Sequence, residues 1–323
     1  MFIVLFYSKL SKLMNKAKFL LLFLIMQVNH LNSQLAIGSI EEFFIEHNAY
    51  DRRIQIYYPF NNQVDQNTKF VIMNDAEELF LEEDTWRGKS WRIDKTFQDL
   101  AKSSKNLNIV VIAVNSAKKP GKILNSTRRY ADYFPNESIY YFEDGLKKTI
   151  YSTFIDKENL NYPKFLATSL IPELEDRLKI ELNKNNLGVI GSSMGGLSAL
   201  NTIIEYPELF GFAGCLSTHW IGIKPFEYMT LPLRKRITAD DDTVNAIKDY
   251  VETNIHKLKD HKIYFDHGTR GLDYLYKDPQ ININKIFEEN NVSYRSEVHK
   301  GHEHSPEDFG KRLKSIILYM LES

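Results

Sequence analysis

We expect an α/β protein from this sequence, with a mostly parallel central sheet and helices on both of its faces. Three observations predict it. Buried apolar runs alternate with segments of helical spacing along almost the whole chain. Residues 107–114 are a long aliphatic run, as in a central strand. Residues 187–204 contain a short apolar run, a glycine-rich turn and a helix in direct succession. Strands buried on both faces, each followed by a helix, are typical of parallel sheets.

The expected elements follow the chain in order. Alternating or wholly apolar runs predict strands at 53–58, 69–73, 107–114, 187–190, 210–216, 262–265 and 294–298. Apolar residues at helical spacing predict helices at 91–100, 165–182, 197–204, 243–258, 282–290 and 307–321. Residues 115–162 are expected to form a long irregular loop that covers or lines a site. Because no repeat or linker divides residues 35–323, we expect one domain there.

Composition excludes several classes of function. Among 323 residues, 41 Lys and Arg nearly balance 42 Asp and Glu, so no charge excess points to nucleic acid or an anionic membrane. The single cysteine, Cys215, rules out an intrachain disulfide framework and argues against a cysteine-based zinc site. It lies in an apolar run and is expected in the core. We therefore expect neither a cofactor nor a metal.

The first 34 residues differ from the rest. Lys16 and Lys18 precede an apolar run at 19–26, and a more polar segment follows. This order is typical of a secretory signal peptide, and the run is short for a membrane span. Met14 is an alternative start, and a retained N-terminal anchor is the alternative interpretation. We expect a periplasmic or secreted protein with no stable membrane span after cleavage.

The glycine-rich turn carries the strongest chemical signal. Its sequence at 191–195, Gly-Ser-Ser-Met-Gly, fits the G-x-S-x-G nucleophile elbow between a strand and a helix. Such a turn strains the backbone at Ser193 and leaves no room for neighbouring side chains. In return the hydroxyl stands at a helix N-terminus, which favours a developing oxyanion. The alternative is a glycine-rich turn with an incidental serine.

A serine nucleophile needs a histidine base and an acid that orients it, and both should follow it along the chain. The acid is Asp266 or Asp273, each after the strand at 262–265. Asp273 is favoured because it lies beyond a glycine-bearing turn and can reach the next loop. The base is His302 or His304, which precede the last helix. A metal held by His302, His304 and Asp266 is a weaker interpretation.

Two backbone amides should hold the oxyanion. One belongs to Met194, the residue after the nucleophile, and the other to the loop at 74–77.

Several motifs resemble the esterase D-like branch of α/β-hydrolases, which includes enterochelin, feruloyl and acetyl-xylan esterases and mycolyltransferases. They are RRIQIYYP at 52–59, MNDAEELF at 73–80, WRID at 91–94, RRYADYFP at 128–135, GSSMGG at 191–196, STHW at 217–220 and GHEHS at 301–305. The resemblance implies an α/β-hydrolase fold, closest to the enterochelin-esterase-like group. It implies Ser193 rather than Ser192 as nucleophile, His304 as base and Asp273 as acid.

The resemblance also places the loop's oxyanion amide near Glu77. Two departures from the family pattern, Asn74 and Ala76, leave this backbone donor in place but affect the expected substrate preference.

Four further residues are candidates for substrate binding. Arg128 or Arg129 can hold a substrate carboxylate, or can pair with Asp132 or another carboxylate. His219 and Trp220 can form a pocket wall or be packed in the core.

These observations predict a serine esterase that acts through an acyl-enzyme on a small-molecule or glycan ester, such as a siderophore, carbohydrate or small acyl ester. An acyltransferase on the same fold and a catalytically silent binding protein are the alternatives.

Overall fold

The computed structural model describes residues 35–47, 51–60, 64–85, 88–103, 107–117, 125–158, 160–222 and 238–322. The signal peptide expected at 1–34 lies outside these residues. Within them, no helix is long and apolar enough to cross a bilayer.

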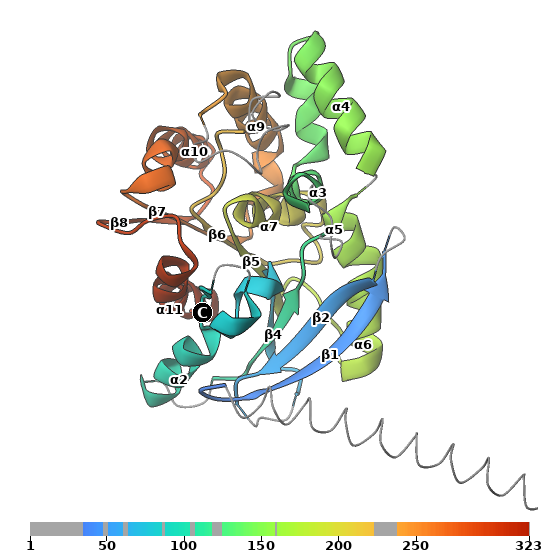
Figure 1. Cartoon of the computed structure of the whole chain (residues 1–323), viewed down its shortest axis with the longest axis vertical. Helices are drawn as coiled ribbons and strands as arrows, with labels where there is room; N and C mark the ends of the chain where they lie inside the picture. Colours follow the sequence, from blue (N-terminus) through green and yellow to red (C-terminus); the bar gives the residue numbers. More distant parts are fainter. Residues whose placement is uncertain are drawn as a thin grey trace, which may run out of the picture.

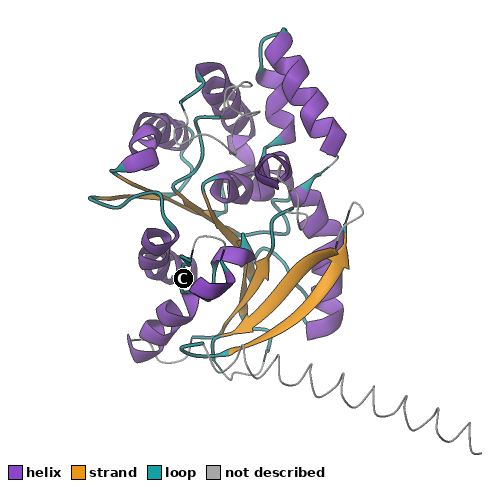
Figure 2. Cartoon of the chain, in the orientation of Figure 1, coloured by secondary structure: helices purple, strands orange, loops and turns teal. Residues whose placement is uncertain are grey.

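One eight-stranded sheet runs through the molecule (Figures 1 and 2). Its strands are β1 (Ser39–Glu46), β2 (Asp51–Tyr58), β3 (Lys69–Asn74), β4 (Ile109–Val114), β5 (Leu187–Ser192), β6 (Phe212–Leu216), β7 (Lys262–Gly268) and β8 (Arg295–His299). Their order across the sheet is β1-β2-β4-β3-β5-β6-β7-β8. The pairs β1–β2 and β2–β4 are antiparallel and all others are parallel. The carboxyl ends of β3 and β5–β8 therefore meet at one edge, where an α/β sheet places its site.

Helices cover both faces of the sheet (Figure 1). One face carries α2 (Ile93–Ser103) and α11 (Pro306–Leu321). The other carries α3 (Asn125–Tyr133), α4 (Leu146–Glu158), α5 (Tyr162–Phe165), α6 (Ile171–Leu178), α7 (Met194–Glu205), α9 (Asp241–Asn254) and α10 (Lys277–Glu289). The expected mostly parallel sheet with helices on both faces is confirmed.

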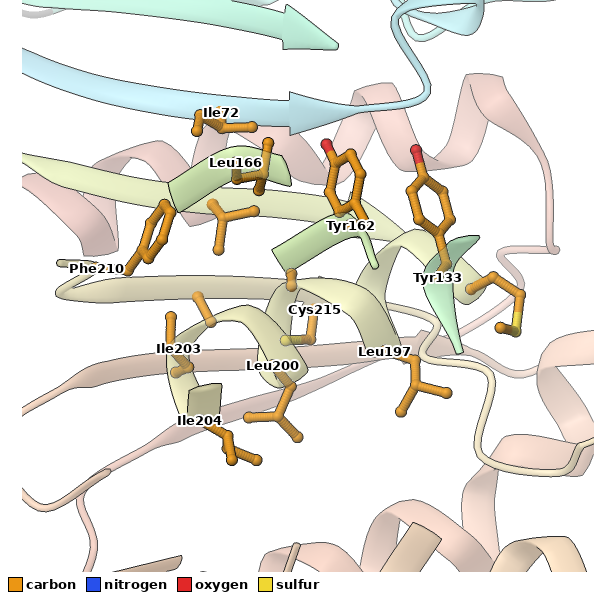
Figure 3. Packing of buried hydrophobic residues seen from close by; sticks show 14 of the residues in the cluster. Ile72, Tyr133, Tyr162, Leu166, Leu197, Leu200, Ile203, Ile204, Phe210 and Cys215 are labelled. Atoms are coloured by element: carbon orange, nitrogen blue, oxygen red, sulfur yellow. The ribbon is translucent and has the colours of Figure 1, made fainter. Parts of the chain in front are cut away.

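The core has two layers because successive side chains of a strand point to opposite faces. In β4, Val110 and Ile112 pack on the α7 side, whereas Val111 and Ala113 pack on the α2 side. Figure 3 shows the α7 layer, in which Cys215 lies among aliphatic and aromatic side chains. Its thiol is fully buried, and burial raises its pKa, which confirms the expected core role.

The expectation of one irregular loop at 115–162 is wrong. This stretch contains α3, the 3-10 helix Asn136–Tyr141 and α4. Its buried positions are aromatic, such as Tyr130, Phe134 and Tyr151, and they stand among polar and charged residues. The aliphatic spacing that normally reveals a helix is therefore missing.

Two smaller differences concern an additional strand and the boundaries of one helix. Strand β1 was not expected, because its polar residues alternate only loosely with its apolar ones: Ile40 and Phe43 are its buried positions. The helix expected at 165–182 starts at Tyr162, where Asn161 accepts a hydrogen bond from the Lys164 amide. It passes through a π-helical turn, Leu166–Leu170, and ends at Leu178, before Lys179, whose φ of 55° is left-handed.

Candidate active site

Ser193 lies at the apex of a tight turn between β5 and α7. Its φ of 57° and ψ of −124° are a strained conformation for a residue other than glycine. Four backbone hydrogen bonds hold this turn in place. The Ser193 amide donates to the Leu216 carbonyl over 2.9 Å, and the Ser193 carbonyl accepts from the amides of Gly196, Leu197 and His219.

Neighbouring segments approach the turn so closely that side chains there would collide. A Cβ on Gly191 would lie 2.4 Å from the Gly195 carbonyl oxygen. A Cβ on Gly195 would lie 3.0 Å from Asp75 Oδ2. The glycines of the motif therefore allow β5, α7 and the end of β3 to meet at Ser193.

His304 and Asp273 lie side by side at the same edge of the sheet. The His304 Nδ1–H donates to Asp273 Oδ1 over 2.7 Å. His304 comes from the loop between β8 and α11, and Asp273 from the 3-10 helix Gly271–Tyr276 that follows β7. This bond leaves His304 Nε2 as the nitrogen that can accept a proton. Among the described residues, no hydrogen bond joins His304 to Ser193, and such bonds often tighten only when substrate binds.

Asp273 is fully buried yet well supplied with donors. Its Oδ2 accepts from the Gly268 amide over 2.6 Å, from Ser217 Oγ over 2.7 Å and from an Arg312 nitrogen over 3.3 Å. Burial alone raises the pKa of this carboxyl, but the hydrogen bonds from His304, Ser217 and Gly268 outweigh it. The pKa of Asp273 is therefore lowered, and the group is an anion suited to orient an imidazole.

The alternative acid, Asp266, has different partners. Its Oδ1 accepts from an Arg312 nitrogen over 3.1 Å and from the Ser217 amide over 3.2 Å, and its Oδ2 lies 3.6 Å from His299 Nε2. Asp266 therefore ties α11 to the end of β6.

The alternative base, His302, contacts α11. Its Nδ1 accepts a hydrogen bond from Arg312 Nε over 3.3 Å. His267 donates from Nδ1 to the Gly268 carbonyl over 2.6 Å. In the described part of the chain, no three His, Cys, Asp or Glu side chains converge as a metal site would require.

The loop after β3 is locked against the elbow. Asn74 Nδ2 donates to the Gly195 carbonyl over 2.9 Å, and Asn74 Oδ1 accepts from the Tyr162 hydroxyl over 2.6 Å. The short 3-10 helix Ala76–Glu78 uses the amides of Glu78 and Leu79 for its own turn. The Glu77 amide comes before these two donors, at the start of the helix, where amides have no acceptor within the helix itself. Met194 opens α7 in the same way.

Arg129 fixes the same loop. Its Nε and a terminal nitrogen donate to the two carboxylate oxygens of Asp75 over 2.6 and 2.7 Å. Asp75 itself has a left-handed φ of 60°, so the bidentate pair stabilises a strained residue beside the elbow. Arg128, the other basic candidate, lies partly exposed on α3. Asp132, the expected structural partner, instead pairs with Arg52, at 2.9 and 3.0 Å.

His219 and Trp220 are both almost fully buried. Trp220 donates its indole N–H to Gln280 over 2.9 Å and packs near Phe265, which is the packed-aromatic alternative. His219 instead contacts Tyr276 next to Ser193.

Three residues near the site were not anticipated: Ser217, Tyr276 and Arg312. Arg312 carried a signal, since it stands in the apolar stripe of α11 made by Phe309, Leu313 and Ile316. A charged residue there needs a buried partner. Ser217 and Tyr276 carried no comparable signal, because their roles depend on contacts between segments distant in sequence.

The sheet order, the elbow after β5 and the His304–Asp273 pair define an α/β-hydrolase. Solved structures share this fold. A ferulic acid esterase superposes with a TM-score of 0.60 at 14% identity, over 88% of this chain and 98% of that chain. The enterobactin and salmochelin hydrolase IroE gives a TM-score of 0.57 at 15% identity, over 89% and 98% of the two chains.

The family follows from the sequence match. A model of the Esterase family, described as "Putative esterase", matches residues 48–319, and the chain belongs to this family. The protein is thus an esterase, as the motifs had indicated. The uncharacterized protein YbbA of Bacillus subtilis (strain 168) is 31% identical over 61 residues, which are 19% of this chain and 24% of YbbA. The match to YbbA therefore spans about a quarter of that protein's length.

Proposed function

We propose that the protein hydrolyses carboxylic esters with Ser193 as nucleophile, His304 as base and Asp273 as the acid that orients His304. One observation carries the proposal. At the sheet edge where Ser193 stands in its strained turn, an imidazole and a buried carboxylate are joined by a 2.7 Å hydrogen bond. An imidazole oriented by a buried carboxylate in this way is typical of nucleophile activation.

The reaction proceeds in two stages. Ser193 Oγ attacks the ester carbonyl carbon while His304 Nε2 takes the hydroxyl proton. The amides of Met194 and Glu77 stabilise the oxyanion. The C–O bond to the alcohol then breaks, and His304 returns the proton to the leaving oxygen. Water, deprotonated by His304, attacks the acyl-enzyme, and the acid leaves as Ser193 regains its proton.

The substrate is proposed as a small-molecule or glycan ester, for example a siderophore, carbohydrate or small acyl ester. Support comes from the family and from structural neighbours named for enterobactin and ferulic acid. A panel of aryl, feruloyl, acetyl-xylan and catecholate siderophore esters tests it. One class should exceed the others in kcat/KM by more than tenfold, and an equal rate for all would contradict a dedicated substrate class.

A fluorophosphonate probe tests the nucleophile. The wild-type protein should be labelled on Ser193, and Ser193→Ala should not be labelled. Ser192→Ala is the matched control, because Ser192 is the buried neighbour in the same turn, and it should keep the label. A folded wild type that resists the probe, or an equally labelled Ser193→Ala, would show the proposal to be wrong.

We also propose export of the protein, supported by Lys16, Lys18 and the apolar run at 19–26. Cell fractionation should find the full chain outside the cytoplasm. A chain that starts at Leu35, or one with Leu21→Arg and Leu22→Arg, should stay inside. If all three fractionate alike, the segment does not direct export.

A further inference from the structure

The turn that follows β6 is bonded to the nucleophile elbow. The Leu216 carbonyl accepts from the Ser193 amide over 2.9 Å, and the His219 amide donates to the Ser193 carbonyl over 3.1 Å. Ser217 stands between these two contacts in the chain and is fully buried. Because backbone groups on both sides of Ser217 are bonded to Ser193, Ser217 has a fixed position relative to the elbow.

The Ser217 side chain reaches the other half of the proposed site. Its Oγ lies 2.7 Å from Asp273 Oδ2 and 2.8 Å from an Arg312 nitrogen. Arginine can only donate, so Ser217 Oγ accepts from Arg312 and gives its own hydrogen to Asp273. The Gly268 amide also donates to Asp273 Oδ2, over 2.6 Å, so this oxygen acts as an acceptor. The other oxygen of Asp273, Oδ1, accepts from His304.

Ser217 also has an unusual backbone conformation. Its φ of 40° lies in the left-handed region, which glycine adopts readily and other residues adopt at a cost in free energy. The Ser217 amide donates to the Asp266 carbonyl over 2.8 Å, which helps to hold the residue in this conformation. Strained residues of this kind cluster at functional sites. The hydroxyl is what glycine could not supply at this position.

We propose that Ser217 is a positioning residue, which sets the spacing between the Ser193 elbow and the pair formed by His304 and its acid. This inference rests on the proposed function of that site. Among the described residues no hydrogen bond joins Ser193 to His304, so their alignment depends on the contacts between them. Residues 216–219 hold the elbow, Ser217 Oγ holds Asp273, and Asp273 holds His304. Without the hydroxyl, Asp273 and His304 can shift together relative to Ser193, and small misplacements of reacting groups slow a reaction strongly.

Two substitutions remove the hydroxyl but differ in their effect on the backbone. Ser217→Ala keeps the cost of the left-handed φ, whereas Ser217→Gly relieves it, so Ser217→Gly should have the higher melting temperature. Both should lower the second-order rate of fluorophosphonate labelling and kcat in ester hydrolysis by about tenfold, the equivalent of one ordinary hydrogen bond. KM should change by less than about twofold, because the buried Ser217 has no surface that a substrate could contact.

Two controls match the two features of Ser217. Ser138→Ala removes another fully buried serine hydroxyl, which donates to the Pro135 carbonyl over 2.6 Å. Lys179→Gly relieves another left-handed φ, of 55°, after the end of α6. Neither should change the labelling rate. If Ser217 were merely structural, the rate would follow the melting temperature, and Ser217→Gly would be labelled faster than Ser217→Ala. That result, or a wild-type rate in both variants, would overturn this inference.

A second measurement does not depend on activity. The hydrogen between His304 Nδ1 and Asp273 Oδ1 should give a low-field ¹H NMR signal, assigned by its loss in His304→Ala. Ser217→Ala should move this signal further downfield, because an Asp273 carboxylate with one donor fewer accepts more strongly from His304. Ser138→Ala should not move it. An unmoved signal in Ser217→Ala would count against this inference, while a labelled wild type kept the proposed function intact. An unlabelled wild type would contradict the proposed function, and the signal would still decide whether Ser217 acts on the His304–Asp273 pair.

Discussion

Replacing Arg312 by methionine should strongly lower the free energy of unfolding, because two buried carboxylates would lose their cationic partner. The Arg312 guanidinium is fully buried and donates toward Asp266 at 3.1 Å and Asp273 at 3.3 Å. It also donates to Ser217 Oγ over 2.8 Å and to the Glu303 carbonyl over 3.2 Å. Methionine has a similar volume but no charge and no donor. Removing one partner of a buried ion pair costs about 3–5 kcal/mol, and we expect this loss in Arg312→Met.

Most of that loss of stability should come from Asp266 rather than from Asp273. Without Arg312, Asp273 keeps the His304, Ser217 and Gly268 donors. Asp266 Oδ1 keeps only the Ser217 amide, at 3.2 Å. The second substitution Asp266→Asn removes this charge, so Arg312→Met/Asp266→Asn should recover about 2 kcal/mol of the free energy of unfolding.

Urea unfolding followed by tryptophan fluorescence measures both changes. Lys311→Met is the matched control, because it replaces the adjacent exposed cation of α11 and should cost less than about 1 kcal/mol. If Arg312→Met costs no more stability than Lys311→Met, or if Asp266→Asn deepens the loss, the buried ion pairs of Arg312 do not stabilise the fold.

Three further predictions concern the site. Asp273→Asn should lower kcat by up to about 10⁴-fold in steady-state ester hydrolysis, since the amide no longer orients His304; a change below tenfold would contradict the assigned acid. Gly191→Ala should abolish labelling and lower the melting temperature, because its Cβ would meet the Gly195 carbonyl at 2.4 Å, whereas Gly145→Ala, with open space around it, should do neither. Burial lowers the pKa of His219 from 6.5 to about 3. The neutral ring therefore contributes fully to the free energy of unfolding above pH 6.5, and this contribution is lost as the pH falls toward 3. Acid titration of unfolding should therefore be shallower in His219→Leu, and an unchanged slope would show that His219 is not buried as a neutral ring.

The local sequence pattern was sufficient to predict the central strands of the sheet. β3, β4 and β5 are continuous apolar runs whose neighbours on both faces are apolar too, so no tertiary information was needed to recognise them. The elbow was equally local, because the backbone angles of Ser193 and the crowding at Gly191 arise within one strand–turn–helix unit.

The local sequence pattern failed to predict helices whose buried residues are aromatic and stand among polar residues. The helices α3 and α4 bury Tyr130 and Tyr151, whose hydroxyls lie 3.3 Å apart, and their polar residues hide the helical spacing. The choice between Asp266 and Asp273 also lay beyond the sequence. Both follow the same strand, and their roles separate only when the loop with His304 folds over β7 and α11 brings Arg312 to Asp266.

The order of residues alone therefore decided the α/β class, the strand–turn–helix at Ser193 and the chain order of serine, acid and histidine. Each of these depends on short-range spacing and backbone sterics. Contacts between distant segments decided which carboxylate holds His304, that Arg129 supports the loop after β3, and that Tyr276 is hydrogen-bonded to His219. The physical reason is the reach of the interactions: a hydrogen bond selects its partner by position in space, and only the assembled sheet edge fixes those positions.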